Sequence, residues 1–344
     1  MSKLKFKPKH VTKRLLGALP ERSRAILVYR YGLDDSIKPH TLDAIGGKYG
    51  VTRERIRQIE NNSINNIRKS EQYRSSNYVF EELHNFVDNL GAVVEEKHLL
   101  SNIDEKKDSQ NHALLLLILG DTFEKHKEDD DFQHRWNIDK NLSSSVYAGL
   151  RSLHNSIPRD KLFKEEEMIS NLFGFIKDEV DLKYHNDEIM RRWLLLSKKL
   201  AQNPLGEWGS TFSPNVRAKG IRDYAYLAIK KQGSPMHFTE VAKSIRELFE
   251  RDAHEATCHN ELIKDGRFVL VGRGLYALSE WGYSSGVVKD VIRDMINKYG
   301  PLSKQEIIEH VKKERYVKDN TILVNLQDAK SFKRDESGRY RLSY

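Results

Sequence analysis

Cysteine is almost absent from this sequence of 344 residues, since Cys258 is its single example. One cysteine excludes an internal disulfide framework and is typical of a reducing compartment, so we expect a cytoplasmic protein. Long hydrophobic runs are missing as well. The longest, residues 113–119, falls far short of the ~20 apolar residues that span a bilayer, and the basic N-terminus has no apolar core behind it. The sequence therefore predicts neither a membrane span nor a secretion signal.

Motifs for catalysis and cofactor binding are also missing. The sequence contains no Walker loop, dinucleotide-binding glycine fingerprint, Gly-x-Ser-x-Gly elbow or His-Glu-x-x-His motif. His254, Cys258 and His259 include two potential zinc ligands one helical turn apart, but no second cysteine completes a tetrahedral set. We therefore expect no bound metal and no cofactor.

One trio of residues has the spacing of a metal-dependent nuclease. Asp88, Glu95 and Lys97 match the carboxylates and lysine of such a site. However, Glu95 begins a segment that is typical of a helix, and the strands that carry nuclease residues are not predicted around it. The expectation is therefore a protein that is not an enzyme.

Positive charge is concentrated at one end of the chain. Residues 1–75 hold 17 Lys/Arg against 7 Asp/Glu, a net charge of +10, whereas the remainder holds 41 against 43. A basic segment of this kind predicts contact with a polyanion. A solvated basic tail is the alternative that charge alone leaves open. Hydrophobic residues make up 38% of the chain and predict folded cores.

A pair of helices joined by a tight turn is predicted inside the basic segment. Hydrophobic periodicity indicates helical structure over residues 11–31, ahead of this pair. Thr41 is a good N-cap for the first helix, which ends near Gly50, and the second helix begins at Thr52. This spacing is typical of a helix-turn-helix, whose second helix enters the major groove of DNA.

The second helix of the pair has an apolar side and a polar side. Its apolar side holds Ile56, Ile59 and Ile67, and its polar side holds Glu54, Arg57, Gln58, Asn61 and Asn65. Arginine matches the edge of guanine, glutamine or asparagine that of adenine, and glutamate that of cytosine. Arg53 lies in the first turn, where recognition helices touch bases. An ordinary solvent-facing surface is the alternative that periodicity leaves open.

Several blocks of this segment resemble region 4 of the primary sigma factors of bacterial RNA polymerase. The blocks are residues 19–33, 41–46, 51–60 and 66–69, in the order and spacing of that family. The resemblance implies that the helix-turn-helix reads a −35-type promoter element. The base-reading residues that it implies are Arg53, Glu54, Arg57 and Gln58.

The same resemblance implies contacts with the DNA backbone and with a protein partner. Helix N-termini favour phosphate, because their free amides and dipole attract anions. The expected backbone contacts are Arg30, Thr41, Leu42, Asp43, Thr52, Arg55 and Lys69. The implied partners are double-stranded promoter DNA and the flap of the polymerase β subunit.

Two departures from the sigma family stand out. Only about ten residues precede the match, where a complete sigma factor has the regions that bind core polymerase and melt DNA, so we expect a regulator outside a complete sigma factor. Gly46 and Gly47 add flexibility to the first helix of the motif. The asparagine-rich residues 61–66 predict a shorter or less stable second helix.

Beyond residue 77 the sequence repeats loosely. Trp136, Trp208 and Trp281 are spaced by 72 and 73 residues, which predicts tandem modules. Each has an amphipathic helix, a Gly or Pro break, a second helix and a strand pair, as in a winged helix. The acidic residues 129–131 are typical of a solvated hairpin turn. The predicted fold is mainly α and multi-domain, with a helix-turn-helix domain at 1–76 and winged-helix (α+β) modules at 77–140, 141–212, 213–283 and 284–344.

The third module resembles the HARE-type winged helix-turn-helix, which also occurs in the delta subunit of bacterial RNA polymerase and in some restriction enzymes. The resemblance rests on residues 234–245 and 259–282, with a Val-Gly-Arg-Gly-x-Tyr-x-Leu wing. Arg267 and Arg273 are candidate phosphate contacts of this wing. Protein binding is an equal alternative for the module.

Together these features predict a sequence-specific DNA-binding transcription regulator that is associated with the nucleoid and contacts RNA polymerase during initiation. The alternative is a winged-helix scaffold that binds proteins within a transcription or restriction/defence complex. The near-neutral charge after residue 75 favours the scaffold role for the C-terminal part, because non-specific DNA binding needs basic surface.

Overall fold

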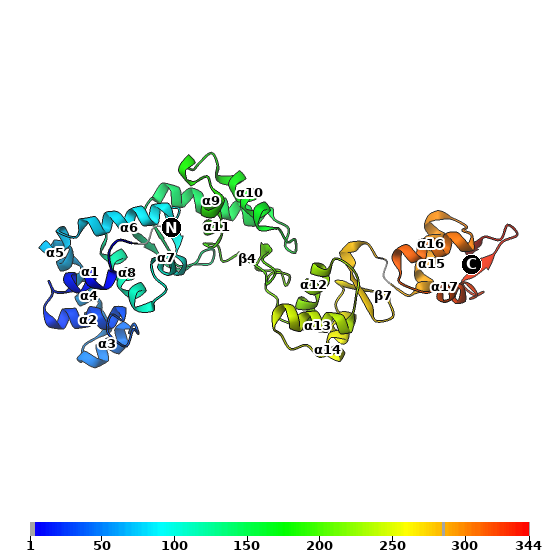
Figure 1. The fold of residues 1–344 in the computed structure, drawn as a ribbon, viewed down its shortest axis with the longest axis horizontal. Coiled ribbons are helices and arrows are strands. Elements are labelled where there is room, and N and C mark those ends of the chain that lie inside the picture. Colours follow the sequence, from blue (N-terminus) through cyan, green and yellow to red (C-terminus); the bar gives the residue numbers. More distant parts are fainter. Residues whose placement is uncertain (1–3, 284–285, 344) are drawn as a thin grey trace. The chain divides into compact units, whose positions relative to one another are not determined.

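The computed structural model describes residues 4–283 and 286–343. The chain divides into two compact units, the first running through Gln202 with Glu207–Phe212, and the second formed by Asn203–Gly206 and the chain from Ser213 onward. Most of the described chain is helical, with small two-stranded and three-stranded sheets, as Figure 1 shows. In the described ranges, no helix has the length and apolar character needed to cross a membrane.

The N-terminal part of the first unit consists of helices joined by short turns. They are α1 (Pro8–Leu16), α2 (Glu21–Tyr31), α3 (Leu42–Tyr49), α4 (Arg53–Lys69) and α5 (Glu71–Arg74). The periodic stretch 11–31 forms α1 and α2, and the break between them ends at Pro20, which has no backbone N–H to continue a helix. The boundaries predicted for α3 and α4 at Thr41, Gly50 and Thr52 are confirmed.

One order of elements then occurs twice in the first unit: a helix, a strand or single bridge, further helices and a hairpin. The first occurrence contains α6 (Asn77–Asn89), β1 (Val93–Glu95), α7 (Glu96–Ile103), α8 (Lys107–Leu119), β2 (Glu124–His126) and β3 (Arg135–Asn137). The second contains α9 (Lys140–Ser156), a bridge from Phe163 to Trp208, α10 (Glu165–Ile176), η1 (Leu182–Tyr184), α11 (Asp187–Leu194), β4 (Leu200–Gln202) and β5 (Trp208–Ser210).

The second unit shows the same order twice more. The first occurrence contains α12 (Ile221–Gln232), β6 (Met236–His237), α13 (Phe238–Phe249), α14 (Glu255–Lys264), β7 (Phe268–Gly272), β8 (Leu275–Leu278) and the short η2 (Ser279–Trp281). The next contains α15 (Val288–Tyr299), a bridge from Leu302 to Tyr340, α16 (Lys304–Glu314), α17 (Asp319–Leu326), β9 (Phe332–Arg334) and β10 (Tyr340–Leu342).

The register of the strands defines equivalent positions in these four segments. In each, the last strand pairs with its hairpin partner and also with the residue or strand that precedes the second helix. The aromatic residues at this central position are Trp136, Trp208, Tyr276 and Tyr340. The use of Trp281 as the third marker was therefore wrong, because Trp281 lies in η2, after the hairpin.

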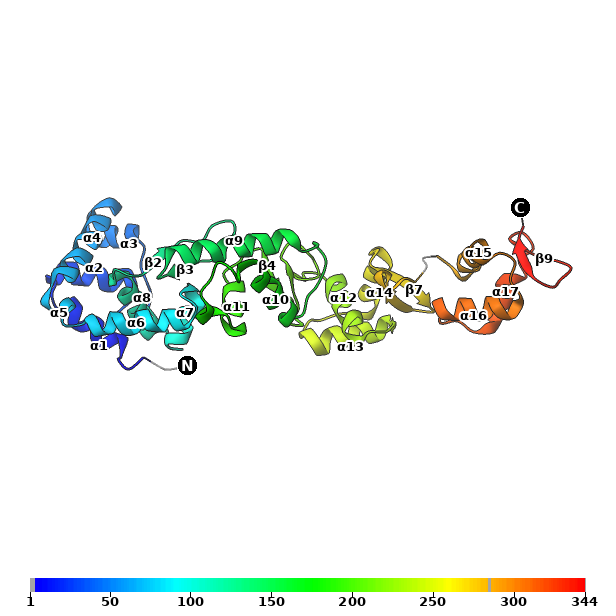
Figure 2. The same ribbon diagram turned by 90° about the horizontal axis from the view of Figure 1, so that it is seen from above.

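The N-terminal helices share a hydrophobic core with the first of these segments. Leu15 of α1, Leu27 of α2 and Ile67 of α4 are fully buried in it. Helix α8 contributes the fully buried residues Ala113, Leu115, Leu116, Leu117 and Leu119. A helix that is apolar on all sides needs neighbours all round, and α1, α2, α4 and α7 all contact α8 (Figures 1 and 2). The helix-turn-helix is thus not built as a separate module.

The hairpin turn at residues 129–131 matches its prediction only in part. Asp129 accepts hydrogen bonds from the backbone of Asp131 and Phe132. Asp131 pairs with Arg151 at 2.7 Å and with Lys199 at 2.5 Å, both of which belong to the following segment. Asp129 and Asp130 are exposed, as predicted for a solvated turn, whereas Asp131 is half-buried and its ion pairs hold this end of the turn against the next part of the same unit.

Candidate nucleic-acid interface

A small apolar cluster orients the helix-turn-helix. Ile26 of α2, Ile45 of α3 and Ile56 of α4 are buried against one another, with Tyr29 and Ile59 packed around them. Because α4 is held by its inner side, its opposite side is presented to solvent. The apolar side predicted from periodicity is confirmed for Ile56 and Ile67, while Ile59 is half-buried.

The joint between α3 and α4 depends on a close backbone approach. Gly50 ends α3 in the left-handed conformation with φ 64°, and the Val51 N–H donates to the Gly46 carbonyl at 3.0 Å. A Cβ atom at Gly46 would lie 2.6 Å from the Val51 carbonyl oxygen, whereas a Cβ at Gly47 would meet nothing within 4 Å. Gly46 is therefore required for close packing, which differs from the flexibility that the sequence suggested.

The N-termini of both helices are capped by threonine side chains. The Thr41 Oγ1 accepts from the Ala44 N–H and the Thr52 Oγ1 accepts from the Arg55 N–H, each at 3.2 Å. In these caps the hydroxyl oxygens are bonded to amides of the first turn, and the caps define where α3 and α4 begin. Contacts of Thr41 and Thr52 with DNA phosphates stay a prediction.

The predicted base-reading residues lie together on the exposed side of α4. Arg53, Glu54 and Arg57 have side chains that are 69%, 57% and 54% exposed, and Gln58 is exposed beside them. Asn61 and Asn65 continue this exposed side. The structure thus brings the four side chains to one accessible surface, and their contact with bases stays a prediction.

Three of the base-reading candidates, Glu54, Arg57 and Gln58, form hydrogen bonds with neighbouring side chains of α4. Arg57 donates to both carboxylate oxygens of Glu54, with Nη2 at 2.6 Å and Nε at 2.9 Å. Arg55 donates from Nη1 to the Gln58 Oε1 at 3.2 Å. Hydrogen bonds from Arg57 hold the pKa of the Glu54 carboxyl below its usual value. Glu54 is therefore an ionised acceptor at neutral pH, and DNA would have to compete with Arg57 for it.

Helix α4 continues without a break through its asparagine-rich stretch to Lys69, so the expectation of a shorter helix was wrong. Its inner stripe is Ile56, Glu60, Ser63 and Ile67, all buried. The Ser63 hydroxyl donates to the Ile59 carbonyl at 2.6 Å. The asparagines stand on the exposed side, where tertiary packing of the inner stripe compensates for their low helix propensity.

A buried polar cluster behind α4 was not predicted. The Tyr31 hydroxyl donates to Glu60 Oε1 at 2.7 Å, and Arg30 Nε donates to the same oxygen at 3.3 Å. Burial raises the pKa of Tyr31 well above its usual value. Glu60 lies one helical turn beyond Ile56 and therefore on the apolar side of α4. This position in the helical period is the sequence signal that could have indicated its burial. Arg30 also donates to the His40 carbonyl, so its geometry favours an internal role over a phosphate contact.

The remaining backbone candidates of the helix-turn-helix differ in exposure. Leu42 is half-buried against the small core, so only its backbone could face a phosphate. Asp43 is 70% exposed and lies 3.8 Å from Arg53, and a carboxylate there repels phosphate while attracting the arginine. Arg55 and Lys69 are exposed and free of such a conflict.

The two candidates in the second unit occupy unlike environments. Arg267 pairs with Asp265 at 2.6 Å and with Asp223 at 2.9 Å, and it donates to the Asn215 side chain at 3.0 Å. This network favours a structural role for Arg267. Arg273 is exposed in the turn between β7 and β8. A phosphate contact of either arginine stays a prediction.

Among the metal and nuclease candidates, Cys258, His259, Asp88 and Glu95 have structural roles. Cys258 is buried, which raises its pKa to about 11, and His259 stacks on Phe238. Asp88 accepts from Lys183 at 2.9 Å. The Glu95 side chain caps α7 by accepting from the His98 N–H. Over residues 4–283 and 286–343, no group of three or more His, Cys, Asp or Glu is arranged to hold a metal ion.

Comparison with known proteins identifies the helix-turn-helix region. Residues 15–69 match the family described as "Sigma-70, region 4". The chain is similar to the RNA polymerase principal sigma factor HrdD of Streptomyces viridifaciens, with 44% identity over 55 residues. That match covers 16% of this chain and 16% of the relative. The predicted resemblance to sigma region 4 is confirmed, and it applies to the N-terminal part of the chain.

Proposed function

We propose that this protein is a sequence-specific DNA-binding regulator of transcription initiation that is not an enzyme. In this proposal α4 enters the major groove of a −35-type promoter element on the bacterial nucleoid. The observation that carries the proposal is the exposed set Arg53, Glu54, Arg57 and Gln58, which lies on the first turns of a helix that matches sigma region 4. Their side chains are of the types that discriminate bases in the major groove.

RNA polymerase is the protein partner that the sigma resemblance supports. The inner sides of α1, α2 and α4 already pack on α8, so a contact with the β flap would have to use other surfaces of this region. Purified core polymerase added to the full chain and promoter DNA tests this part of the proposal. A ternary complex that forms more tightly than either binary complex would support it.

Selection of duplexes from a random pool by the full chain tests the DNA-binding proposal. We expect one preferred sequence. Arg53→Ala and Gln58→Ala should each weaken binding to that sequence by about 1–3 kcal/mol. The preference at the contacted base pair should relax in the same variants. Arg217→Ala, which removes an exposed arginine of the second unit, is the matched control.

The two classes of contact give different results in that experiment. Lys69→Ala should weaken binding to all sequences equally and reduce the dependence of binding on salt, because it would remove a phosphate contact only. Loss of affinity by the same factor on every sequence in Arg53→Ala would contradict its role as a base reader.

The four segments with recurrent element order are proposed to be winged helices, the third of HARE type. Their helix–strand–helix–helix–hairpin order and sheet pairing support this assignment. A second function, as a protein-binding scaffold, is favoured by the hairpin turn at residues 129–131. Ion pairs to Arg151 and Lys199 hold this turn within the chain, so it is not free to enter a DNA groove.

A further inference from the structure

The hairpin formed by β9 and β10, which are the last elements of the described chain, concentrates positive charge near the C-terminus. Residues 330–341 hold five Lys/Arg and two Asp/Glu. Residues 284–344 hold 13 Lys/Arg against 9 Asp/Glu, whereas residues 77–140 hold 7 against 15. The near-neutral net charge beyond residue 75 therefore combines an acidic segment, which follows the helix-turn-helix in the sequence, with a second basic segment at the C-terminal end.

Two of these cations are held side by side. Lys333 and Arg341 are register partners in the antiparallel pair, and both are exposed. Directly opposite side chains share one face of a sheet with Cβ atoms about 4.5–5.5 Å apart, and like charges in this position destabilise the pair. A bound anion would relieve this repulsion, so the arrangement favours a negatively charged ligand.

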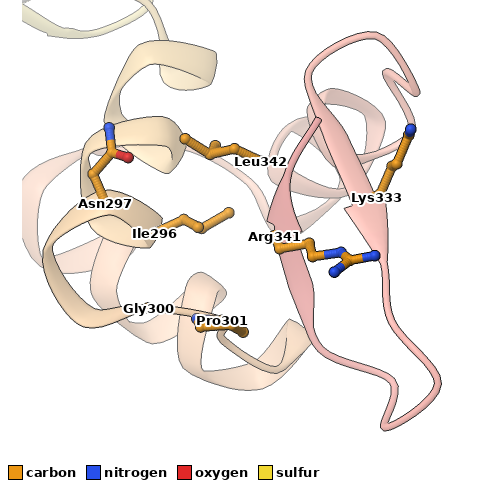
Figure 3. Close-up of a pocket in the computed structure, with 7 residues that line it drawn as sticks. All are labelled: Ile296, Asn297, Gly300, Pro301, Lys333, Arg341 and Leu342. Atoms are coloured by element: carbon orange, nitrogen blue, oxygen red, sulfur yellow. The ribbon is translucent and has the colours of Figure 1, made fainter. Parts of the chain in front are cut away.

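The hairpin separates this charged face from the core. Phe332 is buried, and its register partner Leu342 points toward Ile296 of α15, while Arg341 extends to the other side, toward the strand of Lys333 (Figure 3). A hollow of about 470 Å³ lies between the hairpin and the end of α15. It is lined by Ile296, Asn297, Gly300, Pro301, Lys333, Arg341 and Leu342, a set without a carboxylate.

Hydrogen bonds set the shape of the hairpin before any ligand binds. The Asp335 carboxylate accepts from the Ser337 hydroxyl at 2.7 Å and from the Arg339 N–H at 2.9 Å. The Asp335 N–H donates to the Arg339 carbonyl at 2.8 Å, and Arg339 Nη1 donates to the Pro301 carbonyl at 3.3 Å. A preformed hairpin loses little conformational entropy on binding.

The helix that precedes this hairpin does not offer a comparable surface for reading bases. Helix α17, which precedes the hairpin, carries a single charged side chain, Asp319, and no cation. Cations on a hairpin without a basic recognition helix are suited to the phosphate backbone, which carries no sequence information. We infer that Lys333 and Arg341 form a second, sequence-independent contact with the backbone of double-stranded DNA. The inference takes its ligand from the proposed function of α4.

Salt titration of DNA binding by the full chain tests this inference. Each phosphate contact contributes about 0.9 to the slope of log affinity against log salt concentration. We expect Lys333→Ala/Arg341→Ala to reduce that slope by about 1.8 on a duplex of random sequence, without changing sequence preference. Lys304→Ala/Lys313→Ala removes the same charge from exposed positions of α16 and should leave the slope unchanged. Lys333→Arg/Arg341→Lys, which keeps both charges, should retain it.

The outcomes distinguish this contact from the one made by α4. When Lys333→Ala/Arg341→Ala is added to a chain that already carries Arg53→Ala/Arg57→Ala, the slope should fall by the same amount as in the wild-type chain, because the hairpin acts independently. A wild-type chain that has no sequence preference but keeps a hairpin-dependent slope would refute the function proposed for α4 and support the inference. An unchanged slope in Lys333→Ala/Arg341→Ala, or an equal loss in the α16 control, would overturn the inference. Loss of polymerase binding with DNA binding intact would also overturn it and assign the hairpin to a protein.

Discussion

Alanine substitutions at the neighbouring residues Gly46 and Gly47 provide a direct test of the joint between α3 and α4. Both lie inside α3, so each substitution gains about 1 kcal/mol of helix propensity. Only at Gly46 does the new Cβ fall 2.6 Å from a backbone oxygen, that of Val51. Relief of this clash requires a backbone shift, and overpacking of this kind costs about 1–3 kcal/mol.

The difference between the two variants isolates the clash, because the propensity gain is common to both. Amide hydrogen exchange of α3 and α4 in the full chain measures local opening. We expect Gly46→Ala to exchange about 5–150 times faster than Gly47→Ala, which corresponds to about 1–3 kcal/mol. Gly46→Ala should also weaken binding to the selected duplex, because the shift changes the orientation of α4. Equal protection in the two variants would refute the reasoning.

Two further predictions concern the first unit. Leu116→Ala empties part of the core shared by α8 and the helix-turn-helix and should lower the free energy of unfolding by about 2–5 kcal/mol in urea titration. The control Leu182→Ala, at a position 83% exposed, should change the free energy of unfolding by less than about 0.5 kcal/mol. Equal changes in the two variants would contradict the shared core. Hydrogen bonds from Lys199 and Arg151 hold the pKa of Asp131 below its usual value. These pairs therefore stabilise the fold above about pH 3.9, and their contribution is lost as the pH falls through the lower folded-state pKa. Asp131→Asn should reduce this acid sensitivity in urea midpoints measured from about pH 2 to 7, while Asp130→Asn should not.

The sequence predicted those features of the candidate interface whose signals are local, namely its helix boundaries and its exposed side. Thr41 and Thr52 cap their helices through bonds to amides three residues away, and Gly50 ends α3 through its own backbone conformation. Such features need no knowledge of the rest of the fold. The exposure of Arg53, Glu54, Arg57 and Gln58 followed from the helical period of their apolar neighbours, which is also a local property.

The environments that the sequence did not predict depend on partners far along the chain. Arg30 is as basic as Arg55, but Glu60 lies 30 residues away and holds it beside the core. Arg267 was expected in a wing, yet Asp223 lies 44 residues away and pairs with it. The sequence shows that an arginine can bind a phosphate. The distance from that arginine to a carboxylate in the folded chain decides whether the arginine is available for such a contact.

Residues of the chain alone determined the helix-turn-helix, its exposed polar side and the recurrence of helix and hairpin segments. Tertiary structure decided that α8 lies against α1, α2 and α4, that the 129–131 turn is held by Arg151 and Lys199, and that Tyr276 is the equivalent of Trp136 and Trp208. The physical reason is that capping and periodicity act within a few residues. Core sharing, ion pairing and strand register depend instead on which distant segments the folded chain brings into contact.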